Sequence, residues 1–357
     1  MDEKLEKEKF DVAVIGAGPS GLSAAITLKK TGIQRVVILE REAVAGGIPR
    51  HCGHPPFGIR EFKRVLTGPK YAKKLVEEAQ NVGVIIKLKT TVTMLGVGGE
   101  LTLTSPEGGE QLSAKRVLLA TGIRETPCST RMVSGSRPLG IITTGALQSM
   151  VYLKNRIPFR RPIIVGTEIV SYSALLTCHK AGIQPVSILE ERPRPIVRWP
   201  IYKLGSWLGV PLLLQTNLVK ILGKERVEAA EVSDGSSQTR KIVCDGVLFT
   251  GQYTPESSLA RISHLEFDPK TNSPEVDEFG RCSDPAYYAS GNMVQPPREE
   301  AKVPIYYTAE NLPNPVDNAG QCWGQGRTTA RNIVKDLAGK LPSISVQSRG
   351  LNETRSH

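Results

Sequence analysis

The chain has 357 residues, of which 39% are apolar, and it carries a formal net charge of +11. This length and apolar content suffice for two core-forming domains. The basic residues are spread along the chain, and no nucleic-acid-binding module is recognisable. The charge therefore indicates a basic surface and a preference for anionic ligands, and it excludes a nucleic-acid-binding role from the leading interpretations.

The six cysteines stand far apart, without the CxxC spacing that holds zinc or an iron–sulfur cluster, so we expect no metal site. The charged segment 1–11 lacks the apolar core of a signal peptide. Residues 196–214 form the most lipid-like segment, but Arg, Lys and Pro residues interrupt it, which argues against a transmembrane helix. We expect a cytoplasmic protein, and peripheral contact of this segment with lipid, or with a partner, stays open.

Residues 10–42 contain a strand-like apolar run, a glycine-rich turn, a helical pattern and a second apolar run. The turn has glycines at Gly16, Gly18 and Gly21, and the second apolar run ends on Glu40. This order is the fingerprint of a dinucleotide-binding βαβ unit in its expected context.

Each residue of the turn has a physical role. Gly16 lets the chain turn sharply off the strand, Gly18 leaves room for a pyrophosphate beside the backbone N–H groups, and Gly21 lets the helix pack closely. The helix N-terminus, worth about half a positive charge, then faces the phosphates. Glu40 is placed to accept hydrogen bonds from the ribose hydroxyls. Further nucleotide contacts in this unit and in the following loop are expected at Pro19, Ser20, Arg41 and Gly47.

Residues 160–191 repeat the order of strand, turn, helix and strand, but their turn is altered. It has Gly166, then Glu168 in the place of the second glycine and Ser171 in the place of the third. Two like charges ~4 Å apart repel by about 1 kcal/mol in water and about 4 kcal/mol near a protein surface. The larger value corresponds to roughly a thousandfold in affinity. A carboxylate at Glu168 is also expected to replace phosphate at the helix N-terminus.

We therefore expect this second unit to bind NAD(P) poorly or not at all. The alternative is that Glu168 swings aside and the unit still takes an adenine nucleotide.

Three further segments carry a resemblance to a known family: VLLATGIRETP at 117–127, VCDGVLFTGQYTPESSL at 243–259 and PEVDEFGRCSDPAYYASGN at 274–292. With the two βαβ units they resemble the flavoprotein disulfide reductase superfamily, from residue 10 to residue 341. The resemblance implies an α/β fold with two dinucleotide-binding domains. It places a discontinuous, Rossmann-like FAD-binding domain at 1–150 and 246–357, and an inserted, degenerate NAD(P)-binding-like domain at 151–245.

The resemblance also implies FAD as cofactor. The closing signature of the superfamily normally ends in Gly-Asp, and here it ends in Gly-Asn, which keeps a hydrogen-bonding side chain but gives up the charge. The family pattern places a later helix N-terminus under the flavin, where its positive end stabilises anionic reduced flavin. The implied FAD contacts are Ala120, Thr121, Gly122, Gly291, Asn292 and Ala319.

In this superfamily the loop after the first unit passes the flavin, so His51, Cys52 and His54 are the nearest reactive side chains. The two histidines are candidates for acid or base, because imidazole exchanges protons near neutral pH. Cys52 lacks the second cysteine of the redox-active CxxxxC pair, which leaves a lone thiol beside flavin. A polar loop without chemistry is the alternative.

The segments GGIPRHCGHPPFG at 46–58 and RPLGIITTGALQ at 137–148 resemble one branch most. It contains the FAD-dependent subunits of opine oxidase, hydrogen cyanide synthase and hydroxyproline dehydrogenase. The branch implies oxidation of an amine, imino acid or hydroxy acid by hydride transfer to flavin, with electrons passed to oxygen, a quinone or a partner protein.

Two alternatives are an NAD(P)H-dependent flavin reductase and a non-catalytic or electron-relay subunit of a hetero-oligomer. We expect a small-molecule substrate, an oligomeric assembly and a partner subunit. Residues 295–315 read as an insertion that serves as a lid, a partner contact or a solvated loop.

Overall fold

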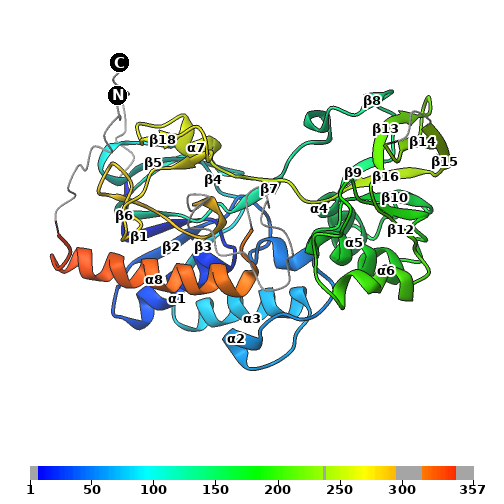
Figure 1. The fold of residues 1–357 in the computed structure, drawn as a ribbon. Coiled ribbons are helices and arrows are strands. Elements are labelled where there is room, and N and C mark those ends of the chain that lie inside the picture. Colours follow the sequence, from blue (N-terminus) through cyan, green and yellow to red (C-terminus); the bar gives the residue numbers. More distant parts are fainter. Residues whose placement is uncertain (1–6, 236–238, 295–315, 343–357) are drawn as a thin grey trace, which may run out of the picture.

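The computed structural model describes residues 7–235, 239–294 and 316–342, which form two lobes (Figure 1). The predicted insertion at 295–315 lies outside the described residues. Within the described part of the chain, no helix combines the length and the apolarity that a bilayer crossing requires.

The first lobe is built on a seven-stranded sheet in the order β3-β2-β1-β6-β5-β4, and β20 also pairs with β6. Strands β3, β2, β1, β6 and β20 are parallel, whereas β5 and β4 continue the sheet antiparallel. The strands are β1 (Glu8–Ile15), β2 (Val36–Leu39), β3 (Ile85–Lys87), β4 (Thr91–Leu95), β5 (Glu100–Ser105), β6 (Gly108–Leu119) and β20 (Tyr287–Ala289).

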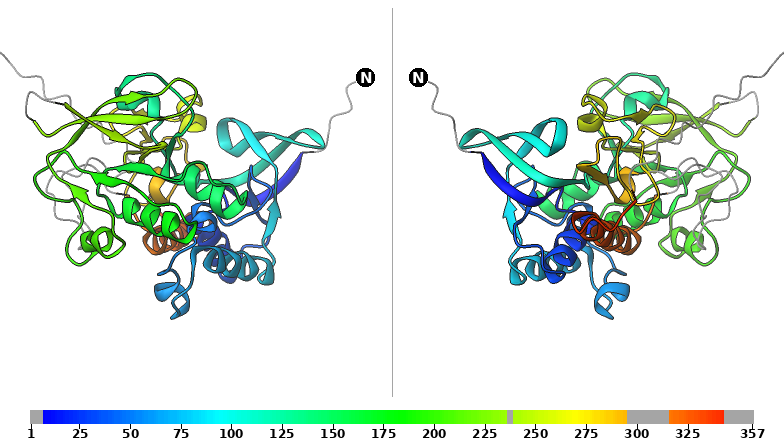
Figure 2. Two further views of the ribbon diagram at one scale, coloured as in Figure 1. Left: turned by 90° about the vertical axis from the view of Figure 1, so that its right-hand side faces the viewer. Right: turned by 90° about the vertical axis from the view of Figure 1, so that its left-hand side faces the viewer.

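Three long helices cover one face of this sheet: α1 (Pro19–Lys30), α3 (Gly68–Asn81) and α8 (Ala319–Leu337) (Figure 1). The apolar run of β1 is buried on both faces, as in parallel sheets with covered faces, and its two sets of side chains enter two separate core clusters. Helix α8 packs directly on α1, and both are seen nearly end-on in Figure 2. A Cβ at Gly326 would lie 2.1 Å from the carbonyl oxygen of Ser20, so glycine permits this close approach.

The second lobe contains a five-stranded parallel sheet in the order β12-β11-β10-β16-β9 and a smaller sheet in the order β15-β14-β13-β8. Helices α4 (Thr144–Gln148), α5 (Ile169–Lys180) and α6 (Leu204–Trp207) lie on one side of the parallel sheet (Figure 1). The strands are β8 (Ser134–Gly135), β9 (Ile141–Thr143), β10 (Pro162–Val165), β11 (Ser187–Leu189), β12 (Leu212–Leu213), β13 (Asn217–Leu222), β14 (Ala229–Ser233), β15 (Thr239–Val243) and β16 (Gly246–Phe249).

The lobes are joined by an antiparallel pair, β7 (Ile123–Glu125) and β17 (Tyr253–Pro255). Strand β9 precedes residue 150 and β16 follows residue 245, yet both belong to the second sheet. The second lobe therefore extends on both sides beyond the predicted limits 151–245, because these two short strands carry no nucleotide motif and are placed by tertiary pairing. The remaining elements are α2 (Ile59–Phe62), α7 (Ser258–Arg261), β18 (Phe267–Asp268), β19 (Ser273–Pro274), η1 (Ile48–His51), η2 (Val97–Gly99), η3 (Cys128–Arg131), η4 (Ser149–Leu153), η5 (Ile201–Lys203) and η6 (Gly291–Met293).

Candidate functional site

The first glycine turn connects β1 to α1, and two of its glycines are tightly packed against neighbouring backbone. Gly16 has a φ of +105°, which favours glycine, and a Cβ there would lie 2.5 Å from the carbonyl oxygen of Ala120. A Cβ at Gly21 would lie 2.0 Å from the carbonyl oxygen of Gly16. These two glycines are thus required by the protein's own packing.

Gly18 is different, because its backbone is extended (φ −80°, ψ −177°) and a Cβ there would meet no heavy atom within 4 Å. Pro19 follows in the first turn of α1, that turn contains no acidic residue, and no side chain caps the helix. The backbone N–H groups at the N-terminus of α1 thus have no side-chain cap, and the Cβ direction at Gly18 is open. These residues fit the pyrophosphate of FAD.

Glu40 stands beside this turn at the end of β2, and its carboxylate is buried. Its Oε2 accepts a hydrogen bond of 2.8 Å from the backbone N–H of Ala17, and its Oε1 accepts one of 2.9 Å from that of Glu42. Both oxygens are held in one orientation, and each retains acceptor capacity for a ribose hydroxyl.

Other predicted FAD residues converge on the same turn. Gly47 has a φ of +62°, and a Cβ there would lie 2.8 Å from the Cα of Gly18. A Cβ at Gly291 would lie 3.0 Å from that of Ser20, whose hydroxyl donates to Ser290 at 3.1 Å. Three segments far apart in the sequence thus surround the N-terminus of α1.

Three other predicted residues lie near Glu256 or follow a residue that contacts it. The hydroxyl of Thr121 donates to the carbonyl oxygen of Glu256 at 2.6 Å, and Gly122 follows with a φ of +75°. The Arg41 side chain is 64% exposed and lies 3.9 Å from the Glu256 carboxylate. Contact of these residues with FAD stays a prediction.

Asn292 fixes the start of α8. Its Nδ2 donates to the backbone carbonyl oxygen of Asp317 at 2.9 Å, and its Oδ1 accepts from the Asp317 N–H at 2.8 Å. Asn318 and Gln321 then form a capping box with two bonds of 3.0 Å, and α8 begins at Ala319. Asn292 is thereby a positioning residue for the helix end, and its predicted contact with FAD stays a prediction.

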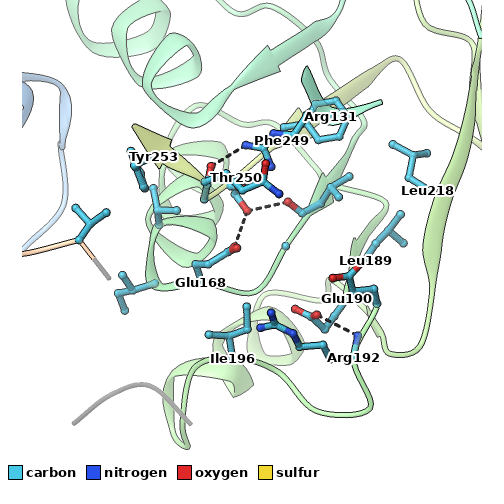
Figure 3. Close-up of a pocket in the computed structure, with 18 of the residues that line it drawn as sticks. Arg131, Glu168, Leu189, Glu190, Arg192, Ile196, Leu218, Phe249, Thr250 and Tyr253 are labelled. Atoms are coloured by element: carbon cyan, nitrogen blue, oxygen red, sulfur yellow. Dashed lines mark hydrogen bonds between the residues drawn. The ribbon is translucent and has the colours of Figure 1, made fainter. Parts of the chain in front are cut away.

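The second turn has the same backbone plan, but a side chain fills it (Figure 3). Glu168 precedes α5, and its Oε2 accepts hydrogen bonds from the hydroxyls of Thr250 at 3.1 Å and Ser171 at 3.3 Å. A Cβ at Gly251 would lie 2.4 Å from the Glu168 carboxyl carbon. Burial raises the pKa of Glu168, and the hydrogen bonds offset this only in part.

One detail of the prediction for Glu168 is wrong. The side chain does not cap α5 as a replacement for phosphate, since it turns toward the end of β16 and bonds to Thr250 there. Glu190 follows β11 as Glu40 follows β2, and it accepts from the hydroxyl of Thr167 in a close hydrogen bond and from the Arg192 N–H at 3.1 Å. The second unit thus retains the acid at its second strand and carries a carboxylate at the second position of its turn.

A cavity of about 550 Å³ lies beside the second turn and reaches the segment that leads into α8 (Figure 3). Arg131 lies on its wall, with the guanidinium 5.3 Å from the centre of the Phe249 ring, and donates to the carbonyl oxygens of Thr250 at 3.1 Å and Gly251 at 2.7 Å. Burial lowers the pKa of Arg131. Asp317 also lines the cavity, and burial raises the pKa of its carboxyl. Sequence reasoning missed both residues, because neither belongs to a local motif.

The predicted reactive loop contacts the second lobe. The pKa of the Cys52 thiol is raised to about 12 by burial and by the charge of Glu125, so this thiol stays protonated near neutral pH. Its sulfur lies 3.6 Å from Oε1 of Gln148, whose Nε2 donates to the hydroxyl of Ser173 at 2.7 Å. The same hydroxyl lies 2.5 Å from Nε2 of His54.

The carbonyl group at the end of this hydrogen-bonded series determines which atoms donate and which accept. Nδ1 of His54 lies 2.8 Å from the carbonyl oxygen of Pro55, which can only accept. Nδ1 therefore carries the proton, and Nε2 accepts from Ser173 on α5. Cys52 and His54 thus belong to one hydrogen-bonded chain that ties the loop to the second lobe.

His51 stands outside this chain. Its Nδ1 is buried and has no hydrogen-bond partner among the described residues. Burial lowers the pKa of the imidazole, which favours the neutral form. His51 thus differs from Cys52 and His54, because one of its ring nitrogens is buried without a partner among the described residues.

The architecture and the first turn define a class: a flavoprotein with two dinucleotide-binding domains. A family model described as pyridine nucleotide-disulphide oxidoreductase matches residues 10–321, and the chain belongs to this family. It is therefore an FAD-dependent oxidoreductase, and the predicted family, fold class and cofactor are confirmed.

Individual relatives are distant. An opine oxidase subunit from Agrobacterium tumefaciens is 24% identical over 314 residues, which cover 79% of this chain and 61% of that protein. The alpha subunit of sarcosine oxidase from Rhizobium meliloti is 24% identical, with coverage of 94% of this chain and 31% of that protein. The structure of T. acidophilum thioredoxin reductase superposes with a TM-score of 0.73 at 20% identity and covers 93% of this chain and 100% of that chain. The chain thus spans less than two thirds of the two oxidase subunits.

Proposed function

We propose that this protein oxidises an amine, an imino acid or a hydroxy acid, with FAD as hydride acceptor, and that the electrons leave to oxygen, a quinone or a partner protein. The filled second turn is the observation that carries this proposal. Glu168 replaces the second glycine of the turn, and its carboxyl group packs against Gly251. We infer that this charge beside the turn disfavours the pyrophosphate of a nicotinamide dinucleotide. A substrate other than NAD(P)H must then supply the electrons.

The similarity to proteins named as subunits of opine oxidase and sarcosine oxidase supports oxidation of a small organic substrate. Because this chain spans only 61% and 31% of those proteins, a complete activity that includes a partner subunit is part of the proposal.

The chain's own residues can handle the proton of such a reaction. Oxidation of a C–N or C–O bond removes a hydride from carbon and a proton from the heteroatom, and bound FAD supplies the hydride acceptor. His51 is the proposed base, because its imidazole favours the neutral form and its Nδ1 has no partner among the described residues. Cys52 is assigned no thiolate chemistry, because its thiol stays protonated.

Anaerobic titration of the FAD-loaded protein tests this function. We expect bleaching of the flavin absorbance by at least one amine, imino acid or hydroxy acid, and little bleaching by NADH or NADPH. His51→Gln should retain FAD and be reduced about 10²- to 10⁴-fold more slowly, the range expected for loss of a general base. Rapid reduction by NADH would instead establish the NAD(P)H-dependent flavin reductase.

An electron-relay subunit is the second candidate, favoured by the fact that both oxidase relatives are named as subunits. In that case no substrate bleaches the flavin of the isolated chain, and bleaching appears when a co-purified second polypeptide is added. Stoichiometric FAD in the inactive chain would separate this outcome from simple loss of cofactor.

A further inference from the structure

We propose that the second lobe docks on an anionic lipid surface through a tryptophan face, defined here as Arg198, Trp199, Lys203 and Trp207. The indole groups of Trp199 and Trp207 are 71% and 69% exposed. Both residues lie on one segment of nine residues and are therefore within about 20 Å of each other. This proposal concerns residues outside the nucleotide turns and does not depend on the substrate of the enzyme.

The local structure directs these side chains outward. Elements η5 (Ile201–Lys203) and α6 (Leu204–Trp207) form consecutive helical turns. Leu204 and Leu208, four residues apart, pack against the core of the lobe. Lys203 and Trp207 have the same spacing, lie about 100° around the helix from the two leucines, and are exposed. The fold thus buries the apolar stripe of the segment and leaves an indole group and a cation in solvent.

The chain segment that contains this face carries charge of one sign. From residue 192 to residue 224 the chain has six basic residues and no Asp or Glu. Helix α5, which packs against η5 and α6, contains no acidic residue and ends in His179 and Lys180. Tryptophan rings prefer the interface between lipid and water, and clustered Lys and Arg side chains are attracted to anionic lipid headgroups.

A lipid surface fits this face better than a second copy of the chain. A two-fold dimer through the tryptophan face would bring Arg198 and Lys203 against their own copies, and the segment offers no carboxylate to balance them. An anionic bilayer supplies negative headgroups for Arg198 and Lys203 and a lipid–water interface for the indole groups. Helix α6 lies at the end of the molecule away from α8 and the first sheet, so docking there leaves the FAD-binding lobe uncovered (Figure 1, Figure 2).

Co-sedimentation of the FAD-loaded protein with vesicles tests the proposal. We expect binding to vesicles that contain phosphatidylglycerol, weak binding to pure phosphatidylcholine vesicles, and loss of binding as salt rises. The double variant Arg198→Gln, Lys203→Gln removes both positive charges. Its partitioning onto phosphatidylglycerol vesicles should be weaker by about 5-fold per charge. Trp199→Ser with Trp207→Ser should abolish quenching of tryptophan fluorescence by brominated phosphatidylglycerol.

Two matched controls distinguish binding through this face from nonspecific electrostatic or apolar binding to vesicles. Lys70→Gln with Lys73→Gln removes the same charge from exposed positions of α3, and Ile262→Ser removes an apolar side chain that is 76% exposed in the first lobe. Both should bind vesicles like the natural protein. Flavin content and circular dichroism of each variant report its folding.

Failure of the natural protein to bind phosphatidylglycerol vesicles at low salt would overturn the proposal. Equal loss of binding in the α3 control would do so as well, because attraction would then reflect net charge alone. Self-association that depends on Trp199 and Trp207, without vesicle binding, would assign the face to a second copy of the chain.

Discussion

The two glycine turns share one backbone plan and differ in what stands before their helices. Gly16 and Gly166, at the first position, have φ values of +105° and +113°, so both turns require glycine there. Gly18 and Glu168, at the second position, both have extended backbones with φ values of −80° and −68°. The second position therefore accepts any side chain as far as the backbone is concerned.

This difference separates folding requirements from ligand requirements. The first position is needed to build the turn, and both units keep it. The second is needed to admit a phosphate, and only the first unit leaves it free of a side chain. The second unit has thus kept its fold while Glu168, Thr250 and Ser171 form a hydrogen-bonded cluster beside its turn.

The strongest test converts the first turn into the second with Gly18→Glu. A Cβ at Gly18 meets no heavy atom, so the fold should tolerate the change, whereas the carboxylate should repel the pyrophosphate. Repulsion of about 1 to 4 kcal/mol predicts up to roughly a thousandfold weaker FAD binding. The purified variant should be folded and nearly colourless, as flavin absorbance and circular dichroism will report.

Gly18→Ala is the matched control, because it adds a Cβ without a charge. It should retain more FAD than the glutamate variant. Stoichiometric FAD in the Gly18→Glu protein would contradict the assignment of this position to the phosphate.

The reverse change, Glu168→Gly, should open the second turn. Ser171 still replaces the third glycine, so we expect a smaller effect, about a tenfold gain in affinity for NADH or NADPH, from removal of the like charge. Fluorescence titration of the nicotinamide measures the affinity.

Glu168→Gln separates charge from volume in the same experiment. A gain in the glutamine variant equal to that in the glycine variant would assign the exclusion to charge. No gain in either variant would mean that the second lobe lacks other parts of a dinucleotide site.

A third test uses the pH dependence of stability. Burial raises the pKa of Glu168 above its ordinary value of 4.5, so between the two values the folded chain binds more protons than the unfolded chain. The stability contributed by this group is full below the ordinary value and is lost as pH rises through the raised one. Relative to Glu168→Gln, the free energy of unfolding of the natural protein should thus fall with rising pH.

Urea denaturation of both proteins across the range from about pH 4 to 8 measures this difference. Glu191→Gln, which removes an exposed neighbouring carboxylate, should leave the slope unchanged. A pH-independent difference between the natural protein and Glu168→Gln would show that the carboxyl group is not desolvated.

Local sequence patterns are sufficient to predict some parts of the fold and of the site. An apolar run, spaced glycines and a helical period predict the first unit, and the structure has β1 at Glu8–Ile15 and α1 at Pro19–Lys30. These elements are specified by residues that lie close together in the chain. Gly47 and Gly291 also pack on Gly18 and Ser20, and all four lie in recognisable signatures, whereas their contact with FAD stays a prediction.

Features that depend on long-range pairing are not predictable in this way. The direction of the Glu168 side chain depends on Thr250, 82 residues later, and the lobe boundary depends on the pairing of β9 with β16. Arg131 enters the cavity wall through its bonds to two carbonyl groups at the end of β16. Such contacts have no local pattern, because tertiary structure alone brings their partners together.

The smallest predicted effect is a loss of stability when the hydrogen bonds between the loop of the first lobe and helix α5 are removed. Ser173 lies on α5, the helix that the second turn opens, and its hydroxyl bonds to Gln148 at 2.7 Å and to His54 at 2.5 Å. Ser173→Ala removes both partners' bonds and should lower the free energy of unfolding by about 1 to 2 kcal/mol. FAD content should not change, because the first turn lies elsewhere.

Hydrogen exchange of the loop at 48–58 distinguishes a local from a global effect. If α5 serves as a docking surface for this loop, exchange there should rise in Ser173→Ala and stay unchanged in Ser258→Ala, which removes an exposed hydroxyl bonded to Glu256 at 3.1 Å. Unchanged protection would mean that packing, rather than the hydrogen bonds of Ser173, holds this loop on the second lobe. The close contact of Tyr152 with Gly53 is an example of such packing.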